Sequence, residues 1–339
     1  MAVVMTGRVL VVRLDSMGDM LVCGPAIRAV AAAAPVTVLA GPAGRAAAEL
    51  LPGVGAVLEW DCPWISADPA PVTAKDCDEI VARLRCERFD AALILTSFHQ
   101  SALPTALLLR LAGIARIAAV STDYPGSLLD VRIPEPPDGP EPQRMLAVAE
   151  AAGYLRAPDD GGELQVLPPP VTGLPGPYLV VHPGAAAPAR TCSPANWQHI
   201  VAGLLGDGHR VVLTGAAGDA DWGAGLPATT DLTGRLRLAE LAGVLAGAAA
   251  VVVGNTGPAH LAAAVGTPVV SLFAPVVPAV RWAPYTPARV VLTDPEAACA
   301  GSRARTCPVP GHPCLDRITP AQVLSALAEL GVAAPAVIG

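Results

Sequence analysis

Short apolar runs rich in Val, Ile, Leu and Ala alternate with Ala- and Leu-rich stretches of helical length through most of the chain. This alternation is typical of βαβ units, which build a parallel sheet with helices on both faces. Strands of such a sheet are apolar along nearly their whole length because both of their faces are buried. The pattern therefore predicts an α/β fold of Rossmann-like, doubly wound sheets.

The alternation falls into two series. In the first we expect strands at Val9–Leu14, Val36–Ala40, Ala56–Glu59, Ala91–Thr96 and Arg116–Val120, with helices near 25–34, 74–87, 102–112 and 142–153. In the second we expect strands at Tyr178–His182, Arg210–Thr214, Ala250–Gly254, Pro268–Phe273 and Val290–Thr293, with helices near 195–206, 238–247, 257–265 and 320–330. The last helix has a start signal, since Thr319 is a good N-cap and Pro320 suits the first helical position.

A proline-rich segment, Leu167–Pro177, separates the two series. Proline lacks an amide donor and fixes φ, so this segment forms neither a helix nor a central strand. We predict an N-terminal domain over 1–168, a C-terminal domain over 178–318, and a helix and tail over 319–339 that return toward the N-terminal domain. The two sheets are expected to face each other across a cleft at the carboxyl ends of their strands, where such folds bind ligands.

The acidic excess lies in one half of the chain. The net charge is −7, with 13 Lys and Arg against 20 Asp and Glu in residues 1–170 and 9 against 9 in 171–339. Nucleic acid and anionic lipid are bound mainly through Lys and Arg, so neither is an expected partner. The longest apolar candidate, Leu241–Val253, is too short to span a membrane, and the N-terminus does not read as a secretory signal. We expect a cytoplasmic chain without a transmembrane segment.

The clearest chemical motif follows the strand at 250–254 and reads Asn255-Thr256-Gly257-Pro258-Ala259-His260. A helix N-terminus offers free amides and a positive dipole end, both of which favour phosphate. Gly257 permits a close approach to the backbone, while Thr256 and His260 add hydrogen-bond donors. The motif predicts a diphosphate site, although Asn255 or Thr256 acting only as a helix cap is an equally good interpretation. The phosphate loops of nicotinamide, flavin and P-loop proteins are absent, and we expect no cofactor.

Two further strand ends carry charged candidates for the same chemistry. Arg190 follows the strand end His182-Pro183-Gly184 in a chain whose one lysine is Lys75, and its guanidinium suits a departing diphosphate. A solvated surface arginine is the alternative. Asp219 follows the strand at 210–214, where it either accepts hydrogen bonds from a ribose diol or caps a short helix.

Asp19 lies just after the first strand, in Arg13-Leu14-Asp15-Ser16-Met17-Gly18-Asp19. At the edge of the predicted cleft its carboxylate would take the proton of an attacking hydroxyl, which is a general-base role. Asp15 and Asp19 serve equally well as caps of the following helix on local pattern alone.

The eight cysteines of a cytoplasmic chain are expected to be reduced thiols. Cys299, Cys307 and Cys314 gather in one proline-rich loop together with His312. Thiolates and an imidazole can ligate zinc or iron, but the spacing is not that of a C-x-x-C site. We therefore predict no metal and keep these four residues as candidates beside the alternatives of packed thiols or a disulfide.

Taken together, the segments Arg13–Asp19, His182–Gly184 and Gly254–Ala262 resemble those of the heptosyltransferases of glycosyltransferase family 9, in the same order over about residues 8–330. The resemblance implies a GT-B fold. It also implies an inverting, metal-independent transfer of a sugar from a nucleoside-diphosphate donor, typically ADP-heptose, to a hydroxyl acceptor.

By position, the resemblance makes Asp19 the general base and Thr256–His260 the turn that binds diphosphate and sugar. Arg190 falls near the family's basic phosphate ligand, although its segment is one residue longer than usual, and Asp219 falls near the acidic residue that faces the nucleoside. Asn255 stands where the family often has an aspartate that contacts the sugar, so the identity of the sugar stays open.

The acidic first half also departs from relatives that act on anionic lipid acceptors, which leads us to expect a neutral or cationic acceptor, such as a small metabolite. Two other functions remain open at this point. A sugar-nucleotide epimerase can share the architecture, and a non-catalytic nucleotide-sugar-binding protein can share the donor site.

Overall fold

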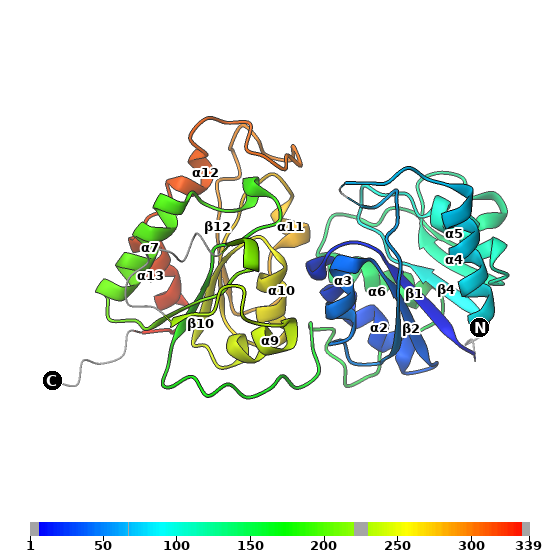
Figure 1. The fold of residues 1–339 in the computed structure, drawn as a ribbon, viewed down its shortest axis with the longest axis horizontal. Coiled ribbons are helices and arrows are strands. Elements are labelled where there is room, and N and C mark those ends of the chain that lie inside the picture. Colours follow the sequence, from blue (N-terminus) through cyan, green and yellow to red (C-terminus); the bar gives the residue numbers. More distant parts are fainter. Residues whose placement is uncertain (1–6, 67, 220–229, 334–339) are drawn as a thin grey trace. The chain divides into compact units, whose positions relative to one another are not determined.

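The computed structural model describes residues 7–66, 68–219 and 230–333. The chain divides into two compact units, Met1–Leu167 and Pro168–Gly339, so the boundary lies at the start of the proline-rich segment. In the described residues each unit contains one six-stranded sheet, with helices packed against it (Figure 1). The predicted α/β architecture of two Rossmann-like sheets is confirmed.

The first sheet has the strand order β3-β2-β1-β4-β5-β6, and every pairing in it is parallel. Its strands are β1 (Val9–Arg13), β2 (Val36–Ala40), β3 (Val54–Glu59), β4 (Ala91–Ile94), β5 (Arg116–Val120) and β6 (Val131–Ile133). The chain leaves β1 in one direction to build β2 and β3, and in the other to build β4 to β6. The carboxyl end of β1 is therefore the switch point at which such sheets bind ligands.

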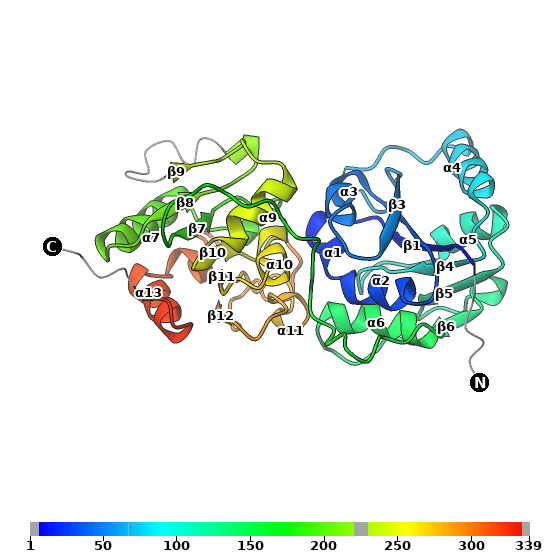
Figure 2. The same cartoon turned by 90° about the horizontal axis from the view of Figure 1, so that it is seen from below.

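Helices cover both faces of this sheet. They are α1 (Met17–Leu21), α2 (Gly24–Ala31), α3 (Pro42–Ala48), α4 (Ala74–Glu87), α5 (Leu103–Leu111), the 3₁₀ turn η1 (Gly126–Leu128) and α6 (Glu141–Ala151). Figure 2 shows α2 and α6 side by side, while α4 and α5 pack together against the face that carries Leu10 and Val12. The strand β1 is buried along its whole length, as its continuous apolar run predicts.

The second sheet has the order β12-β11-β10-β7-β8-β9, and its pairings are also all parallel. Its strands are β7 (Leu179–His182), β8 (Val211–Leu213), β9 (Thr230–Asp231), β10 (Ala250–Gly254), β11 (Val269–Leu272) and β12 (Arg289–Leu292). Here β7 lies at the switch point between β8 and β10, so the ends of these strands are the expected place for a ligand.

The second unit has a helical layer on each face of its sheet. Its helices are η2 (Pro188–Arg190), α7 (Pro194–Gly206), η3 (Ala217–Asp219), α9 (Leu238–Ala246), α10 (Gly257–Ala264), α11 (Ala279–Trp282), α12 (Pro313–Asp316) and α13 (Pro320–Glu329). Helices α7 and α13 pack together on one face around Trp197 and Leu327, and α9 packs on α10 (Figure 1). Thr319 caps α13 through its hydroxyl, as its sequence predicts.

All ten predicted strands are present, and the structure adds β6 and β9 as a further edge strand of each sheet. These two have three and two residues, which is too short for an apolar pattern to stand out. The short helices α1 and α3 were likewise not predicted from the sequence. Among the described residues no helix combines the length and the apolar character needed to cross a membrane.

Candidate active site

The carboxyl end of β1 is built around a fully buried arginine. The side chain of Arg13 has no solvent exposure. Its Nε lies 2.9 Å from Asp15 Oδ2, and its Nη2 lies 2.8 Å from Asp19 Oδ1. Burial disfavours the charged guanidinium, but the two carboxylates outweigh that effect, and the pKa of Arg13 is raised. A permanent positive charge thus holds two carboxylates at the switch point of the first sheet.

Asp19 occupies the third position of α1, where it also completes a cap. Its Oδ2 accepts a hydrogen bond from the Ser16 hydroxyl at 2.6 Å and a longer one from the Ser16 amide at 3.3 Å. The sequence left a base and a helix cap as alternative roles for this residue, and the geometry contains the capping contact. The carboxylate is one-fifth exposed, so it is oriented by the protein and still open to a ligand.

Asp15 is held more deeply than Asp19. Gln100 Nε2, from the loop after β4, donates to Asp15 Oδ1, while the Gln100 side-chain oxygen accepts from the Ser97 amide. Burial raises the pKa of Asp15, with Arg13 opposing and Asp19 adding to the rise. The loop after β4 is joined to Arg13 as well, because Arg13 Nη2 donates to Ser97 Oγ at 2.7 Å.

In the second unit, the predicted phosphate turn connects β10 to α10. Thr256 is the N-cap residue of α10 with extended backbone, but its side chain makes no capping bond. The buried Thr256 Oγ1 has no hydrogen-bond partner among the residues that the structure describes. A buried hydroxyl without a partner is costly, and at a helix N-terminus a bound anion would supply one.

The rest of the turn is compact and mostly buried. Pro258 and Ala259 follow Gly257 into the first turn of α10, and His260 is buried in the same turn. Gly257, Pro258 and Ala259 are small and keep the helix N-terminus free of bulky side chains, which suits the approach of a phosphate to backbone amides.

The side chain of Asn255 bonds to the backbone of the loop after β11. Its side-chain oxygen accepts from the Ala274 amide at 3.2 Å, and its Nδ2 donates to the Ala274 carbonyl at 3.5 Å. The buried amide therefore joins the end of β10 to the loop after β11. The Asn255 side chain thereby fixes the backbone of the loop after β11.

The structure brings the Arg190 segment directly against this turn. A Cβ atom on Gly254 would lie 2.5 Å from the Arg190 carbonyl oxygen, so only glycine fits there. Thr191 Oγ1 donates to the Pro183 carbonyl and accepts from Trp197 Nε1, which fixes the loop between β7 and α7. Arg190 is half-buried, and its segment shares the carboxyl edge of the sheet with Thr256.

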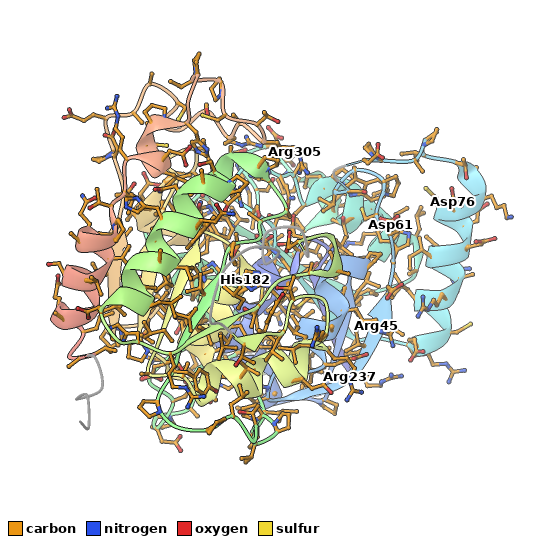
Figure 3. The ribbon with its side chains drawn as sticks, turned by 60° about the vertical axis from the view of Figure 1, so that its left-hand side comes forward. Arg45, Asp61, Asp76, His182, Arg237 and Arg305 are labelled. Carbon is orange, nitrogen blue, oxygen red and sulfur yellow. The ribbon has the colours of Figure 1, made fainter. Side chains whose placement is uncertain are left out.

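A third group at this edge is formed by His182, Thr214 and Asp219. His182 Nδ1 lies 3.0 Å from Thr214 Oγ1, and burial lowers the pKa of His182 to about 4, with Asp219 opposing the shift. Asp219 accepts from the Ala216 amide and packs on Gly184, where a Cβ would lie 2.0 Å from Asp219 Oδ2. Figure 3 marks His182 and also Arg305, whose backbone and side chain bind the segment 186–189.

The cysteine candidates gather as the sequence suggested, but without a metal-binding arrangement. Cys299, Cys307 and Cys314 line a cavity of about 180 Å³ together with Asp294, and His312 is not part of its lining. Burial and the two neighbouring thiols raise the pKa of Cys314 to about 11, so its thiol stays protonated. In the described part of the chain no group of three or more His, Cys, Asp or Glu residues is arranged to hold a metal ion.

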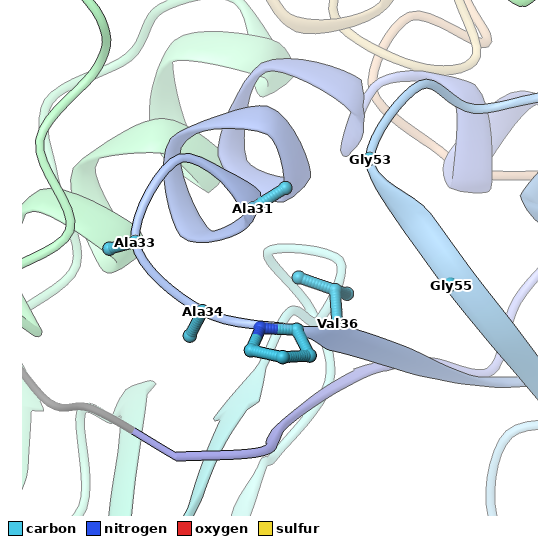
Figure 4. A pocket seen from close by; sticks show the side chains of 7 residues that line it. Ala31, Ala33, Ala34, Val36, Gly53 and Gly55 are labelled. Atoms are coloured by element: carbon cyan, nitrogen blue, oxygen red, sulfur yellow. The ribbon is translucent and has the colours of Figure 1, made fainter.

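A larger surface hollow, of about 480 Å³, lies at the opposite edge of the first sheet, where β2 and β3 begin (Figure 4). Small residues line it, namely Ala31, Ala33, Ala34, Pro35, Val36, Gly53 and Gly55. None of them has a polar side chain, so the hollow supplies no catalytic group.

Sequence reasoning proposed Asp19, Arg190, Asp219 and the turn at Thr256 as site residues, but it assigned no role to the groups that hold them. In the sequence, Arg13 is an ordinary residue at the end of an apolar strand, and no local motif distinguishes Ser97 or Gln100. His182 was visible only as part of a His-Pro-Gly motif. The strand order supplies the missing information, because β1 lies beside β4 and β7 lies beside β8.

Comparison with known proteins places the chain in a family. The model of glycosyltransferase family 9 (heptosyltransferase) matches residues 79–312, which is more than half of the chain. No curated protein matches.

Several solved structures share the fold. ADP-heptose LPS heptosyltransferase II of E. coli is 23% identical with a TM-score of 0.73, and the match covers 95% of this chain and 98% of that one. A family 9 glycosyl transferase of Veillonella parvula DSM 2008 is 17% identical with a TM-score of 0.73, over 96% and 97% of the two chains. E. coli heptosyltransferase WaaC with ADP is 21% identical with a TM-score of 0.68, over 95% and 99%.

Proposed function

This chain belongs to glycosyltransferase family 9, the heptosyltransferases, and from this premise we propose that it transfers a heptose from an ADP-linked donor to a hydroxyl acceptor. The class of enzyme, a glycosyltransferase of GT-B fold, rests on the family and on the structural matches. Solved complexes of WaaC with ADP and with ADP-2-deoxy-2-fluoro heptose support the choice of donor.

The observation that carries the proposal is the turn at the start of α10. It combines a helix N-terminus, a buried Thr256 hydroxyl without a partner, and the Arg190 segment packed on Gly254. Amides, a hydroxyl and a guanidinium are the groups that bind a diphosphate in proteins. We assign the diphosphate to this turn, and the ribose to the neighbourhood of Asp219.

The proposed reaction is a single displacement. Asp19 accepts the proton of the acceptor hydroxyl as its oxygen attacks the anomeric carbon, and the bond from that carbon to the diphosphate oxygen breaks. The electron pair leaves with ADP, whose charge the α10 amides and Arg190 stabilise. Attack from the face opposite the leaving group inverts the anomeric carbon. No step requires a metal ion or a cofactor.

The acceptor is proposed to be neutral or cationic. The base lies beside a second carboxylate, Asp15, and the arginine between the two is fully buried. That guanidinium is not available to an anionic acceptor, and residues 1–170 carry 20 acidic against 13 basic side chains. Charge of this sign disfavours a phosphorylated lipid and suits a polyol or an amine-bearing sugar.

The donor assignment is tested by titrating the protein with ADP, GDP and UDP and following heat or thermal stability. We expect ADP to bind most tightly. Arg190→Ala should weaken ADP binding about 10- to 100-fold, since a hydrogen bond to a charged group contributes about 1.5–3 kcal/mol. Arg210→Ala serves as the control, because Arg210 lies at the amino end of β8, at the opposite edge of the same sheet, where it donates to the Pro175 carbonyl. An unchanged ADP affinity in the Arg190 variant would show that Arg190 is a solvated surface arginine with no part in donor binding.

The reaction is tested by incubating the protein with ADP-heptose and a panel of polyols, aminosugars and phosphorylated lipid acceptors, and measuring product masses. We expect ADP release coupled to a heptosylated acceptor, and equal rates after chelation of metals. Conversion of the donor without any acceptor would identify an epimerase. Donor binding without transfer to any acceptor would identify a binding protein, and preference for the phosphorylated lipid would contradict the acceptor class.

A further inference from the structure

Among the described residues, Arg13 contacts Asp19 with a fully buried guanidinium, and its burial rules out direct contact with a substrate. Its side chain has no solvent exposure, while those of Asp15 and Asp19 are 13% and 20% exposed. A ligand that reaches this edge of the sheet meets the carboxylates first. The arginine therefore acts, if at all, through the groups that it holds.

Those groups come from two segments, the turn after β1 and the loop after β4. Arg13 Nε faces Asp15 Oδ2, and Nη2 faces both Asp19 Oδ1 and Ser97 Oγ, at 2.7–2.9 Å. Nη2 donates hydrogen bonds to Asp19 and Ser97, whereas Nε meets Asp15 as an ion pair. Guanidinium donors are fixed in one plane, so the bonds from Nη2 restrict the orientation of the Asp19 carboxylate. A point charge on a flexible stem would hold the same groups less firmly.

The arginine is itself supported from α6. Glu141 has no solvent exposure, and its carboxylate contributes to the raised pKa of Arg13. Arg144, one helical turn later, lies 3.7 Å from Glu141 and donates to the Thr96 carbonyl and to Glu135. Charges thus alternate from the exposed carboxylates through Arg13 and Glu141 to Arg144, which keeps a deep guanidinium from being isolated.

The two carboxylates differ in what they can offer to an acceptor. Asp15 has one oxygen on Arg13 and the other on Gln100, both within the protein. Asp19 has one oxygen on Arg13, while the other accepts from the hydroxyl of Ser16, which is exposed. A hydroxyl rotates at little cost, so the Ser16 contact can yield its place to the hydroxyl of an acceptor.

We propose that Arg13 is the positioning residue of the reaction, which orients Asp19 as the base and holds Asp15 back from that role. The inference rests on the proposed function of Asp19. Without a cation between them, the neighbouring carboxylates of Asp15 and Asp19 would repel each other. Arg13, at the end of β1, supplies that cation.

The test compares Arg13→Met and Arg13→Lys with Arg28→Met. Arg28 is the matched control, because it forms a bidentate pair with Asp160 at 2.7 and 2.8 Å in the same unit and is nearly as buried. For each variant, kcat, donor KM, thermal stability and the dependence of kcat on pH are measured with the acceptor that the wild type uses.

We expect Arg13→Met to lower kcat about 100-fold, the effect of a small misplacement of a catalytic group, with little change in donor KM. Its acid limb should move up by about 1–3 pH units, since a neighbouring guanidinium favours an ionised carboxylate. Arg13→Lys should recover part of kcat and most of the acid limb. Arg28→Met should lose stability while it keeps both the kcat and the pH profile of the wild type.

The inference is overturned if the Arg13 variants that fold keep the kcat and acid limb of the wild type, or if Arg28→Met changes both to the same degree. Should Arg13→Met fail to fold, Arg13→Lys decides, because it keeps the charge and loses the planar geometry. A wild type that transfers no sugar removes the proposed function and this inference together. An active wild type with unaffected Arg13 variants removes this inference alone.

Discussion

The carboxyl ends of the two sheets solve different chemical problems with different groups. The end of β1 in the first unit is built from full charges, Asp15 and Asp19 around a buried Arg13. The ends of β7 and β10 in the second unit are built from a helix N-terminus, the hydroxyls of Thr256 and Thr214, and an imidazole that burial keeps neutral.

The difference follows from what each end is proposed to hold. A base must be ionised and oriented before the substrate arrives, so its charge is balanced within the protein. A diphosphate brings its own negative charge, so its site needs donors and few carboxylates. The charge count agrees, with the acidic excess confined to residues 1–170. Four changes test this contrast.

The largest effect is expected for Asp19→Asn, which removes the base and preserves the shape of the side chain. Turnover should fall by about 10²–10⁴-fold, the usual contribution of general-base catalysis. ADP affinity should stay at the wild-type value, because the proposed diphosphate ligands belong to the second unit. Steady-state kinetics and an ADP titration measure the two quantities. Turnover close to that of the wild type would take the role of base away from Asp19.

The neutral histidine of the second unit gives the next largest effect. His182 has an ordinary pKa of 6.5 when exposed and about 4 in the fold, so the unfolded chain binds the proton first as pH falls. The stability contributed by neutral His182 is complete above pH 6.5 and is lost as pH falls toward 4. Between pH 7 and 4.5 this amounts to about 2–3 kcal/mol.

Urea unfolding of the wild type and of His182→Asn at these two pH values measures the effect. Asparagine does not titrate in this range, and its amide can bond to Thr214. The variant should therefore lose less stability than the wild type on acidification. Equal losses in the two proteins would show that the fold does not keep His182 neutral. The strand ends of the second unit would then differ less in charge from the end of β1 than we propose.

Gly254→Ala is expected to have an intermediate effect. The new methyl group would lie 2.5 Å from the Arg190 carbonyl oxygen, so the segment before α7 must shift. We expect a loss of stability of about 1–3 kcal/mol and weaker ADP binding. Gly206→Ala, at the end of α7, is the control, since its methyl group meets no atom within 4 Å. Thermal unfolding with and without ADP compares the two variants, and the same ADP response in both would separate Arg190 from the turn.

The smallest effect is expected for Thr256→Val. In the unliganded protein the valine removes a buried hydroxyl that has no partner, so stability should stay level or rise slightly. ADP affinity should fall about fivefold, because about 1 kcal/mol is typical of one hydrogen bond. Thr256→Ser should bind ADP like the wild type. Unchanged ADP affinity in the valine variant would leave Thr256 as a residue that only starts α10.

The sequence predicted the local structure correctly wherever one strand or one helix alone determines it. Continuous apolar runs such as Val9–Arg13 predict buried parallel strands, and Thr319 with Pro320 predicts the start of α13. The same holds for the turn at Thr256, where strand, glycine and helix follow one another directly. Family resemblance added roles for Asp19 and Arg190, and these remain predictions.

Contacts between distant segments were not predictable. Arg13 bonds to Ser97 across 84 residues, and Asp15 bonds to Gln100 across 85, and only the pairing of β1 with β4 brings them together. Nothing local in the sequence indicates that the Asn255 amide bonds to the Ala274 backbone 19 residues away. A single sequence contains no signal for such partners, because polar residues of this kind are common in loops.

The pairing of β1 with β4 also affects when the contacts of Arg13 can form during synthesis of the chain. Residues 13–19 leave the ribosome before the groups that hold them, which follow about 80 residues later, since Arg13 bonds to Ser97. At synthesis rates of about 5–20 residues per second, the carboxylates spend several seconds without their partners. Contacts of such long sequence separation form slowly, because the intervening loop must close first. The proposed base is thus made several seconds before the segment that fixes its surroundings.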